Sequence, residues 1–518
     1  MDTQTGWSSL PEEIVIHILW FCDFFEVVRF RLLNKSHKHL IDAASKLQFL
    51  IELGRDGTAP TFVDSRTPIG ILMDHHISSR KQWTALPLDS PILHPPSGSE
   101  FEIYEFGGGV ITFCVPGEHH DTIRFQDYRN PVSELQSKRI VLAFKCFELS
   151  CDPLQDLVVV IQNHMPNYSV HILSISTGEY HTRANLKVFD NLINYPGVLY
   201  DVSTCISGNV IAFTCSASRS RSDFIAIVVV DWVLGKTLYS STEFSSCHAT
   251  LLSSRYMIMV HCGPSMQWPG PRLELYDLQS DPVAKRQTLL LPLLKSQSTY
   301  SFESSYFLHG SNNAIEADRG DGLIRTGDAD VVALFIKARP SNGARTGRII
   351  VMISRSRLIK LASSPVPMPQ LLFSNWSRNG RYTRWLDIGE GRMRLLSHKG
   401  VYGSRCVCLA NPQDLGVIWA VDGSSSNVCV LDFNLKSFML GEPSRKMHIV
   451  RSIERIDSIT KELEEDVRDG LEFGLTWSKV QSTGNWEDVY LDRDHLVARL
   501  PNGFQVHSIS DELPLRTR

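Results

Sequence analysis

The chain has 518 residues, more than one ordinary domain needs, and its 43% hydrophobic content supports a large folded core. Its 52 basic and 56 acidic residues leave a formal charge of -4, so no overall charge draws the chain to nucleic acid or to a membrane surface. The 11 cysteines are odd in number and dispersed, which argues against a disulfide framework and favours free thiols in a reducing cytoplasm or nucleus.

The first notable segment is the apolar stretch "IVIHILWFCDFF", residues 14–25. A secretory signal needs a positively charged flank before its apolar core, but residues 1–13 contain three acids and no Lys or Arg. A membrane-spanning helix needs about 20 consecutive apolar residues, and Asp23 interrupts this stretch well before that length. We therefore expect a soluble, uncleaved N-terminus.

The same stretch and the residues after it predict three short helices. Pro11 suits a first helical position, and apolar residues follow at helical spacing from Ile14 onward. Asp23 can end the first helix and cap the second, and Asn34 or Ser36 can cap the third. Helices this small cannot bury so many apolar residues among themselves, so an exposed face would need a partner, either the rest of the chain or another protein.

Several positions within residues 8–50 match a known motif in order and spacing. They are Leu10-Pro11-x-Glu13-Ile14, Ile18-Leu19, Asp23, Val27-Val28-Arg29, Leu33-Asn34-Lys35 and Leu40-Ile41. This pattern resembles an F-box, the three-helix motif that binds the Skp adaptor of cullin–RING ubiquitin ligases. His37 departs from the family, which usually has Trp or another aromatic there, and Cys22 stands where Leu is common. An ordinary helical hairpin packed on its own domain is the alternative.

The resemblance implies a set of adaptor-binding residues in the first two helices. They are Leu10, Pro11, Glu13, Ile14, Ile18, Leu19, Val27, Val28 and Leu33. Neither departure touches the segment Leu-Pro-x-Glu-Ile, which the family presents to the adaptor.

A helical linker and a connector follow the F-box-like segment. Residues 42–54 continue with helical spacing, and residues 65–86 predict a further helix with Trp83 near its end. Large fungal F-box families have a similar linker helix before their second domain. Residues 87–99 contain four prolines and predict an extended connector. The expected domains are therefore an F-box at 1–50, a helical linker and Pro-rich connector at 51–100, and a recognition domain at 101–518.

From about residue 101 the pattern predicts short β-strands separated by turn residues. The segments "VVVDW", "ELYDL" and "CVLDF" each end an apolar run in Asp, at residues 231, 277 and 432, and weaker runs in similar phase end near 126, 176, 354 and 508. Repeated units of 40–50 residues are typical of a β-propeller. The sequence predicts six to eight blades and looks like a degenerate WD-type propeller; an irregular pair of β-sandwiches is the alternative.

Local pairings within this region are also predicted. Residues 156–162 and 170–178 should form one hairpin, and 209–215 and 224–232 another. Residues 449–467 have helical spacing and predict a helix inserted late in the domain. Residues 488–510 predict three strands, and we expect them to close the ring against strands within 101–126.

Chemistry-bearing motifs are weak. "FGGGV" at 106–110 lacks the Lys-Ser/Thr of a phosphate-binding loop and predicts a turn or bulge, and residues 318–330 lack EF-hand spacing and predict a polar loop. His119-His120-Asp121 and Cys406-x-Cys408 are isolated metal-ligand fragments, without the paired spacing of zinc sites. The basic segment 218–223 predicts a solvated hairpin loop. We expect no catalytic residue, no cofactor and no metal, and neither a nucleic-acid nor a membrane partner.

The F-box resemblance implies a function in the ubiquitin conjugation pathway. The chain would be the substrate-recognition adaptor of a Skp–cullin–F-box (SCF) ubiquitin ligase, with the N-terminal helices on the Skp-type adaptor and the β-domain on a protein substrate. It would not itself be an enzyme. Two alternatives stay open: an F-box scaffold acting outside any ligase, and a propeller enzyme whose helical N-terminus is incidental.

Overall fold

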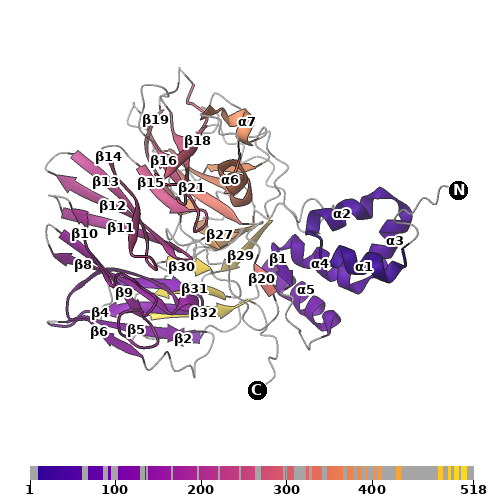
Figure 1. Cartoon of the computed structure of the whole chain (residues 1–518), viewed down its shortest axis with the longest axis horizontal. Coiled ribbons are helices and arrows are strands. Elements are labelled where there is room, and N and C mark those ends of the chain that lie inside the picture. The colour runs from indigo at the N-terminus through magenta and orange to yellow at the C-terminus, as the bar shows by residue number, and fades with distance from the viewer. Residues whose placement is uncertain are drawn as a thin grey trace.

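Figure 1 shows the computed structural model, in which a helical module stands beside a ring of small β-sheets. The residues that the structure describes are 10–60, 68–85, 92–94, 103–118, 120–128, 135, 138–164, 167–194, 198–219, 222–243, 247–262, 270–295, 298, 300–308, 323–325, 330–340, 347–365, 370–377, 382–387, 393–394, 401–402, 405–410, 427–432, 476–481, 488–491, 495–500 and 503–509.

The described part of the helical module contains five helices in chain order. They are α1 (Glu12–Trp20), α2 (Phe24–Leu33), α3 (Lys35–Ala43), α4 (Ser45–Arg55) and α5 (Ile69–Ala85). The three short helices and the two linker helices are therefore confirmed. No described helix combines the length and apolar character that crossing a bilayer requires.

Side-chain caps set the boundaries between the first three helices. The Asp23 carboxylate accepts a hydrogen bond from the Glu26 backbone N–H, and the Glu26 carboxylate accepts one from the Asp23 N–H, so the two form a capping box. The Asn34 side chain accepts a hydrogen bond from the His37 N–H at 2.8 Å. Caps of this kind stabilise a helix by about 1 kcal/mol, because they pair backbone N–H groups that the helix itself cannot.

The core of the module lies between α1, α2, α3 and α4. Val15 and Leu19 of α1 meet Val27 of α2, Ile41 of α3 and Leu47 of α4, and all five are at most 5% exposed. Helix α4 has a second apolar side, on which Phe49 and Leu53 pack against Leu72 of α5. Helix α4 therefore packs against α1, α2 and α3 on one side and against α5 on the other, whereas α1 buries only one of its sides in the core.

Among the described residues, seven sheets of four or five strands form the ring. The first three contain β3 (Ile103–Gly107), β4 (Val110–Val115), β5 (Thr122–Asp127) and β6 (Arg139–Val141); β7 (Cys146–Asp152), β8 (Leu157–His164), β9 (Asn167–Ser174) and β10 (Val188–Asn194); and β11 (Val198–Ser207), β12 (Val210–Arg219), β13 (Ser222–Asp231) and β14 (Lys236–Glu243).

The next two sheets contain β15 (Cys247–Leu251), β16 (Tyr256–His261), β17 (Arg272–Asp277), β18 (Ala284–Leu290) and β23 (Gln370–Leu371); and β19 (Tyr300–Leu308), β21 (Val331–Pro340), β22 (Gly347–Ser354) and β24 (Thr383–Asp387). The last two contain β25 (Met393–Arg394), β26 (Val401–Tyr402), β27 (Arg405–Ala410), β28 (Asn427–Asp432) and β29 (Thr476–Gln481); and β30 (Asp488–Leu491), β31 (His495–Leu500), β32 (Gly503–Ser508) and β2 (Ile92–His94).

This arrangement is a β-propeller, as predicted, with each sheet as one blade. The first strand of one sheet contacts the first strand of the next from β3 through β7, β11 and β15 to β19, so the first strands lie innermost. The phase predicted from the sequence is also correct. Asp231, Asp277 and Asp432 end the third strand of their sheets, and the other four predicted ends lie at or within two residues of the ends of β5, β9, β22 and β32.

The ring closes differently from the prediction. Strands β30 to β32 pair with β2, in the register Leu93 opposite Gln505, and not with strands within 101–126. Residues 101–126 contribute β3, β4 and β5 to a separate first sheet, which packs face to face on the last one. The three C-terminal strands need a fourth strand to become a full blade, and the short segment "ILH" within the Pro-rich connector provides it.

An aromatic cluster fills the space between the first and last sheets. Phe106 stacks on Tyr490 with ring centroids 3.8 Å apart, and Phe504 meets Phe106 edge-on at 5.4 Å. The Tyr490 hydroxyl donates to the Tyr104 hydroxyl at 3.1 Å. Because Tyr104 and Tyr490 are 386 residues apart in sequence, these contacts help to close the ring beside the strand pairing.

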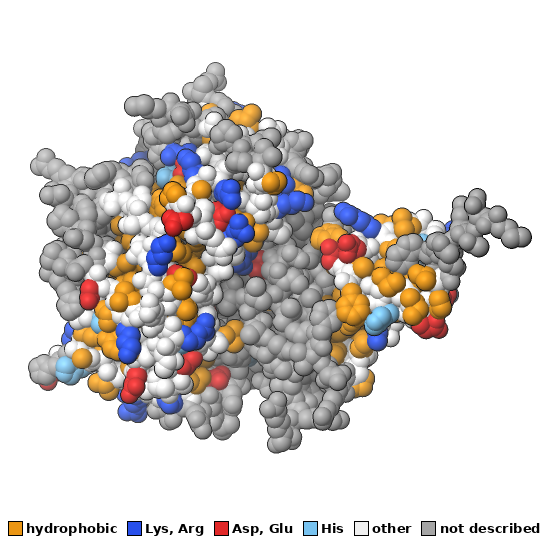
Figure 2. Space-filling view, viewed as in Figure 1, with side chains coloured by type: hydrophobic (Ala, Val, Ile, Leu, Met, Phe, Trp, Pro, Cys, Tyr) orange, Lys and Arg blue, Asp and Glu red, His pale blue; other side chains and the backbone are white. Residues whose placement is uncertain are grey.

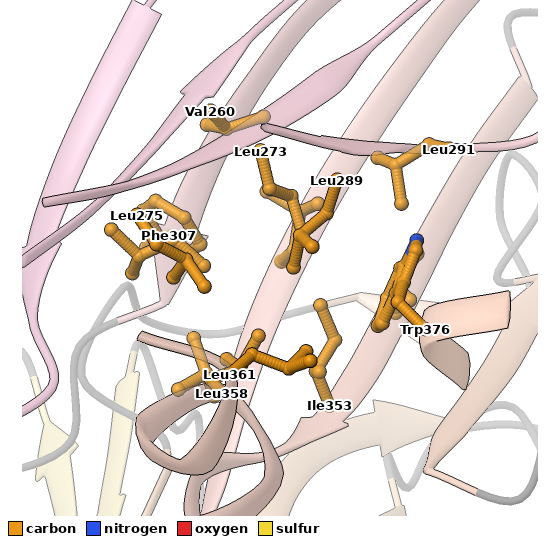
Figure 3. Close-up of a cluster of buried hydrophobic side chains, with 14 of the residues drawn as sticks. Val260, Leu273, Leu275, Leu289, Leu291, Phe307, Ile353, Leu358, Leu361 and Trp376 are labelled. Carbon is orange, nitrogen blue, oxygen red and sulfur yellow. The ribbon is translucent and has the colours of Figure 1, made fainter. Parts of the chain in front are cut away.

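A large apolar core lies between the fourth and fifth sheets (Figure 3). Two helices close it, α6 (Arg355–Ala362) and α7 (Phe373–Ser377), both in the connection from β22 to β24. Leu358 and Leu361 point from α6 toward Leu289 and Phe307. The Trp376 indole N–H donates to the Leu290 carbonyl at 2.9 Å.

The helical module joins the ring at one end of its sheets. In an antiparallel sheet whose strands follow chain order, the first-to-second and third-to-fourth connections lie at the same end. Strand β20 (Leu323–Arg325) lies in the first of these connections of the fifth sheet, and it pairs with β1 (Thr58–Pro60) of the helical module. The second-to-third and sheet-to-sheet connections lie at the opposite end.

Other local predictions can be compared with the structure. Both predicted hairpins form, as β8 with β9 and as β12 with β13. "FGGGV" is a tight turn between β3 and β4, with Gly108 and Gly109 at φ values of 54° and 83° that favour glycine. The predicted helix at 449–467 lies outside the described residues, as does most of the segment 318–330.

Candidate functional site: an exposed apolar face on the N-terminal helices

The nine residues implied by the F-box resemblance fall into two groups. Leu10, Ile14, Ile18 and Leu33 are 41%, 47%, 38% and 66% exposed, and Pro11 and Glu13 are exposed as well. The other three lie inward: Leu19 is 3% and Val27 0% exposed, and Val28 is half-buried against the module's core. The structure therefore makes six of the nine available to a partner, and the remaining three hold α1 and α2 in place.

Helical periodicity explains this division. Ile14 and Ile18 are four residues apart on α1 and share one side of the helix, whereas Val15 and Leu19, each one position later, turn into the core. Two apolar stripes thus run along α1, and α4 covers only one of them. The uncovered stripe is an unusual feature, because large apolar side chains on a short surface helix are normally buried.

Three further residues extend this surface and were missed by the sequence reasoning. Phe21, Phe25 and Leu32 are 61%, 38% and 75% exposed. Phe21 continues the α1 stripe three residues after Ile18, and Leu32 follows Phe25 by two turns of α2. The same spacing argument could have found them. We call the following set the apolar face: Leu10, Ile14, Ile18, Phe21, Phe25, Leu32 and Leu33. Figure 2 shows hydrophobic side chains gathered on the visible side of the module.

The two departures from the family pattern are accommodated by local packing. His37, at a position where the family usually has an aromatic residue, stacks on Phe30 with ring centroids 4.1 Å apart and an interplanar angle of 17°. Cys22 is half-buried against the core, and its thiol donates to the Ile18 carbonyl at 3.6 Å. The imidazole therefore supplies a flat ring where an aromatic side chain is expected.

The helices that carry the apolar face also carry charged groups. Glu12 and Glu13 are exposed in the first turn of α1, where the helix dipole favours negative charge. Asp42 of α3 binds Arg31 at 2.7 Å and Lys38 at 2.5 Å. Hydrogen bonds from Arg31 and then Lys38 hold the pKa of the Asp42 carboxyl below its ordinary value. Arg31 and Lys38 are thus paired within the module.

A second cluster ties the module to the propeller. The Asp56 carboxylate at the end of α4 lies 2.8 Å from His76 Nε2 and 3.4 Å from Arg80 Nη1, both on α5. Burial alone would raise the pKa of Asp56, but the hydrogen bond from His76 and the nearby Arg80 and Arg405 guanidinium groups lower it. Arg405 belongs to β27 and lies over the Trp83 ring, 4.1 Å from its centroid. Together with the β1–β20 pairing, these contacts fix the module on the ring.

The residues in the propeller that carry potential chemistry have structural roles. The Asp231 carboxylate accepts from the Leu234 N–H at 2.8 Å and from the Asn209 side chain, which shapes the turn after β13. Asp277 binds Arg255 and Arg286, and the latter lies 2.9 Å away. Within the part of the chain that the structure describes, no three His, Cys, Asp or Glu side chains come together as metal ligands. Cys406 is buried in β27.

The chain was compared with protein families, curated proteins and solved structures. No protein-family model matches the chain, and no curated protein matches it. Among solved structures, the WD40 domain of Toxoplasma gondii coronin has 8% sequence identity and a TM-score of 0.36, over 83% of this chain and 86% of that one. BamB from Moraxella catarrhalis has 10% identity and a TM-score of 0.31, over 79% and 83%.

The β-propeller domain of the Trilobed protease from Pyrococcus furiosus, described as having an open velcro topology, has 9% identity and a TM-score of 0.28, over 64% of this chain and 94% of that one. Identities and scores this low carry no argument about function. The propeller itself is established by the strand order and register described above.

Proposed function

We propose that the chain is the substrate-recognition adaptor of a Skp–cullin–F-box ubiquitin ligase. The apolar face of the helical module binds a Skp-type adaptor protein, and the propeller binds a protein substrate. The chain supplies no catalysis of its own. It raises the effective concentration of a substrate lysine near the ubiquitin carrier, which the ligase scaffold holds. The free cysteines among the described residues favour a reducing compartment for this activity, the cytoplasm or the nucleus.

The observation that carries the proposal is the uncovered stripe of α1. Ile14 and Ile18 remain 47% and 38% exposed, although Val15 and Leu19 beside them are packed against α4. Covering such side chains stabilises a complex by about 25 cal/mol per Å² of apolar area removed from water. The motif residues Leu10, Pro11 and Glu13 are exposed as well, and Leu10 lies four residues before Ile14.

The propeller suits the second half of the proposal. Apolar cores pack its neighbouring sheets against one another. The connections between its strands lie at the two ends of the ring. In the described part of the chain, the helical module is attached to the ring at β20 and at Arg405. Loops held by a rigid scaffold are common positions for binding residues. The attachment through Asp56, Trp83 and β1 keeps the two binding regions at a defined separation.

A paired substitution tests the proposal. In the double variant Leu10→Asp with Ile14→Asp, two carboxylates enter the apolar contact, and each costs several kcal/mol if it is desolvated without a partner. We expect the variant to lose co-purification with the Skp-type adaptor and with cullin, while its circular dichroism stays unchanged. The matched control is Leu186→Asp with Leu234→Asp, which alters two exposed leucines of the propeller (42% and 63% exposed).

The outcome separates the functional classes. Adaptor recovery that is equal for wild type and for the Leu10/Ile14 variant contradicts the F-box assignment. Recovery of the adaptor without cullin contradicts the ligase role and favours a scaffold. If the control pair alone abolishes adaptor binding, the contact lies on the propeller and not on α1.

A further inference from the structure

The helical module has a strongly divided charge along its chain. Residues 10–28 contain four acids (Glu12, Glu13, Asp23 and Glu26) and no Lys or Arg. Residues 29–39 contain four cations (Arg29, Arg31, Lys35 and Lys38) and no acid. The formal charge therefore changes from -4 to +4 within 30 residues, while the apolar face runs through both parts.

The local structure explains the acidic part. Glu12 and Glu13 lie in the first turn of α1, where the positive end of the helix dipole stabilises them. Asp23 and Glu26 form the capping box of α2. None of these four acids requires a partner molecule to account for its position.

Only two of the four cations in residues 29–39 have a partner within the described module. Arg31 and Lys38 share the carboxylate of Asp42. Arg29 and Lys35 are exposed and make no ion pair with any described residue. Lys35 is also the first residue of α3, where the helix dipole disfavours a cation. Nothing within the described module compensates these two charges.

The two uncompensated cations flank the two most exposed side chains of the apolar face. Leu32 and Leu33 are 75% and 66% exposed, the highest values on the apolar face. Arg29 lies one helical turn before them on α2, and Lys35 follows two residues after Leu33. A surface that covers Leu32 and Leu33 must therefore lie next to Arg29 and Lys35. Two unpaired cations at the rim of a dry contact favour an anionic partner and disfavour a cationic one.

We infer that the partner of the apolar face carries an acidic segment, whose carboxylates contact Arg29 and Lys35 while apolar side chains beside them cover Leu32 and Leu33. This inference rests on the proposed function, because it describes the adaptor protein that the module binds. The acidic segment meets the α2–α3 end of the face, and the acids of α1 repel it from the other end. The charge division thus sets the orientation in which the two proteins dock, and it accelerates their encounter.

The test measures binding of the full chain to a purified Skp-type adaptor protein as association and dissociation rates at increasing salt. The variant is Arg29→Glu with Lys35→Glu. Glu at position 35 improves the N-terminal turn of α3, so the variant should fold. We expect its association rate to fall by about tenfold or more at low salt, and the difference from wild type to shrink as salt screens the charges. The matched control is Lys187→Glu with Lys360→Glu, which makes the same charge change on exposed residues of the propeller and should leave both rates near wild type.

A second variant tests the apolar half of the inference. Leu32→Ser with Leu33→Ser keeps both cations, so we expect an unchanged association rate and a dissociation rate that rises by about tenfold or more. The outcomes that overturn the inference are distinct from those that overturn the function. If the adaptor binds wild type but the Arg29/Lys35 variant and the control behave alike, the acidic segment is wrong and the proposed function stands. If the variant instead changes the self-association of the chain, the face pairs with a second copy. If wild type does not bind the adaptor at all, both proposals fail together.

Discussion

Within residues 10–33 the helical module exposes seven large hydrophobic side chains, whereas the described part of the propeller exposes six across seven sheets: Val141, Leu154, Tyr180, Leu186, Leu234 and Leu372. Described apolar cores join each neighbouring pair from the first sheet to the fifth, and join the last sheet to the first, so the first four sheets have apolar neighbours on both sides. Helix α1 has a neighbour on one side only. The comparison shows where the chain completes its own burial and where it leaves apolar surface uncovered.

The difference follows from the two architectures. In the core between the second and third sheets, Val159 and Ile172 from one sheet face Ile211 and Val228 from the other, and all four are at most 2% exposed. In the module, Val15 is buried by α4 but Ile14 faces solvent. Replacing a buried apolar residue of the propeller should therefore lower stability, whereas replacing an exposed apolar residue of the module should weaken binding.

The largest effect is expected from opening the ring. Deleting residues 487–518 removes β30, β31 and β32 and leaves Phe106 without Tyr490 and Phe504. We expect the propeller to lose its cooperative melting transition and to become sensitive to protease at residues 106–115, because unpaired edges and an opened core destabilise the whole ring. Circular dichroism melting and limited proteolysis measure both effects. Deleting only 511–518, which keeps all three strands, is the control. An unchanged melting transition in the longer deletion would contradict ring closure.

A smaller effect distinguishes two phenylalanines. Phe504 is 1% exposed and packs against Phe106 and Tyr104, so Phe504→Ala should lower the free energy of unfolding by about 3–5 kcal/mol. Phe21 is 61% exposed, and Phe21→Ala should change that free energy by about 0.5 kcal/mol or less while weakening adaptor binding. Denaturant unfolding and binding measurements check the pair. The comparison between the two regions breaks down if Phe21→Ala proves as destabilising as Phe504→Ala.

The smallest effect concerns two paired aspartates. Burial would raise the pKa of Asp277, but hydrogen bonds from Arg255 and Arg286 hold it below its ordinary value, and the pKa of Asp42 is lowered likewise by Arg31 and Lys38. A lowered pKa in the folded state contributes stability above the unfolded pKa of about 3.9, and this contribution is lost as the pH falls through the folded value.

The burial of the two carboxylates differs, and so should the cost of removing each. Asp277 has a side chain 2% exposed, so Asp277→Asn should cost about 1–3 kcal/mol at pH 7. Asp42 has a side chain 33% exposed, so Asp42→Asn should cost about 0.2–1 kcal/mol. The Asp277→Asn variant should also lose less stability on acidification than wild type, because it lacks the carboxylate that acid protonates. Unfolding curves at pH 7 and pH 3 test both points, and equal costs for the two variants would contradict the difference in burial.

The sequence by itself determined the local structure, because local structure depends on periodicity and on caps. Asp23 and Asn34 marked the starts of α2 and α3, and the glycines after Phe106 marked a tight turn. The apolar runs ending at Asp231, Asp277 and Asp432 fixed the repeat, since each closes the third strand of its sheet. The F-box resemblance named Leu10, Ile14, Ile18 and Leu33 of the apolar face, whereas Phe21, Phe25 and Leu32 emerged from their exposure in the structure.

Only the tertiary structure decided which apolar residues stay uncovered and how the ring closes. Ile14 and Val15 are equally apolar, and their different exposure depends on where α4 lies. The closing strand β2 has three residues, too few for an alternating pattern, and its partner β32 is more than 400 residues away. The contact of Arg405 with Trp83 is similarly distant in sequence. Such contacts cannot be predicted from neighbouring residues in the sequence, because they depend on how the whole molecule packs.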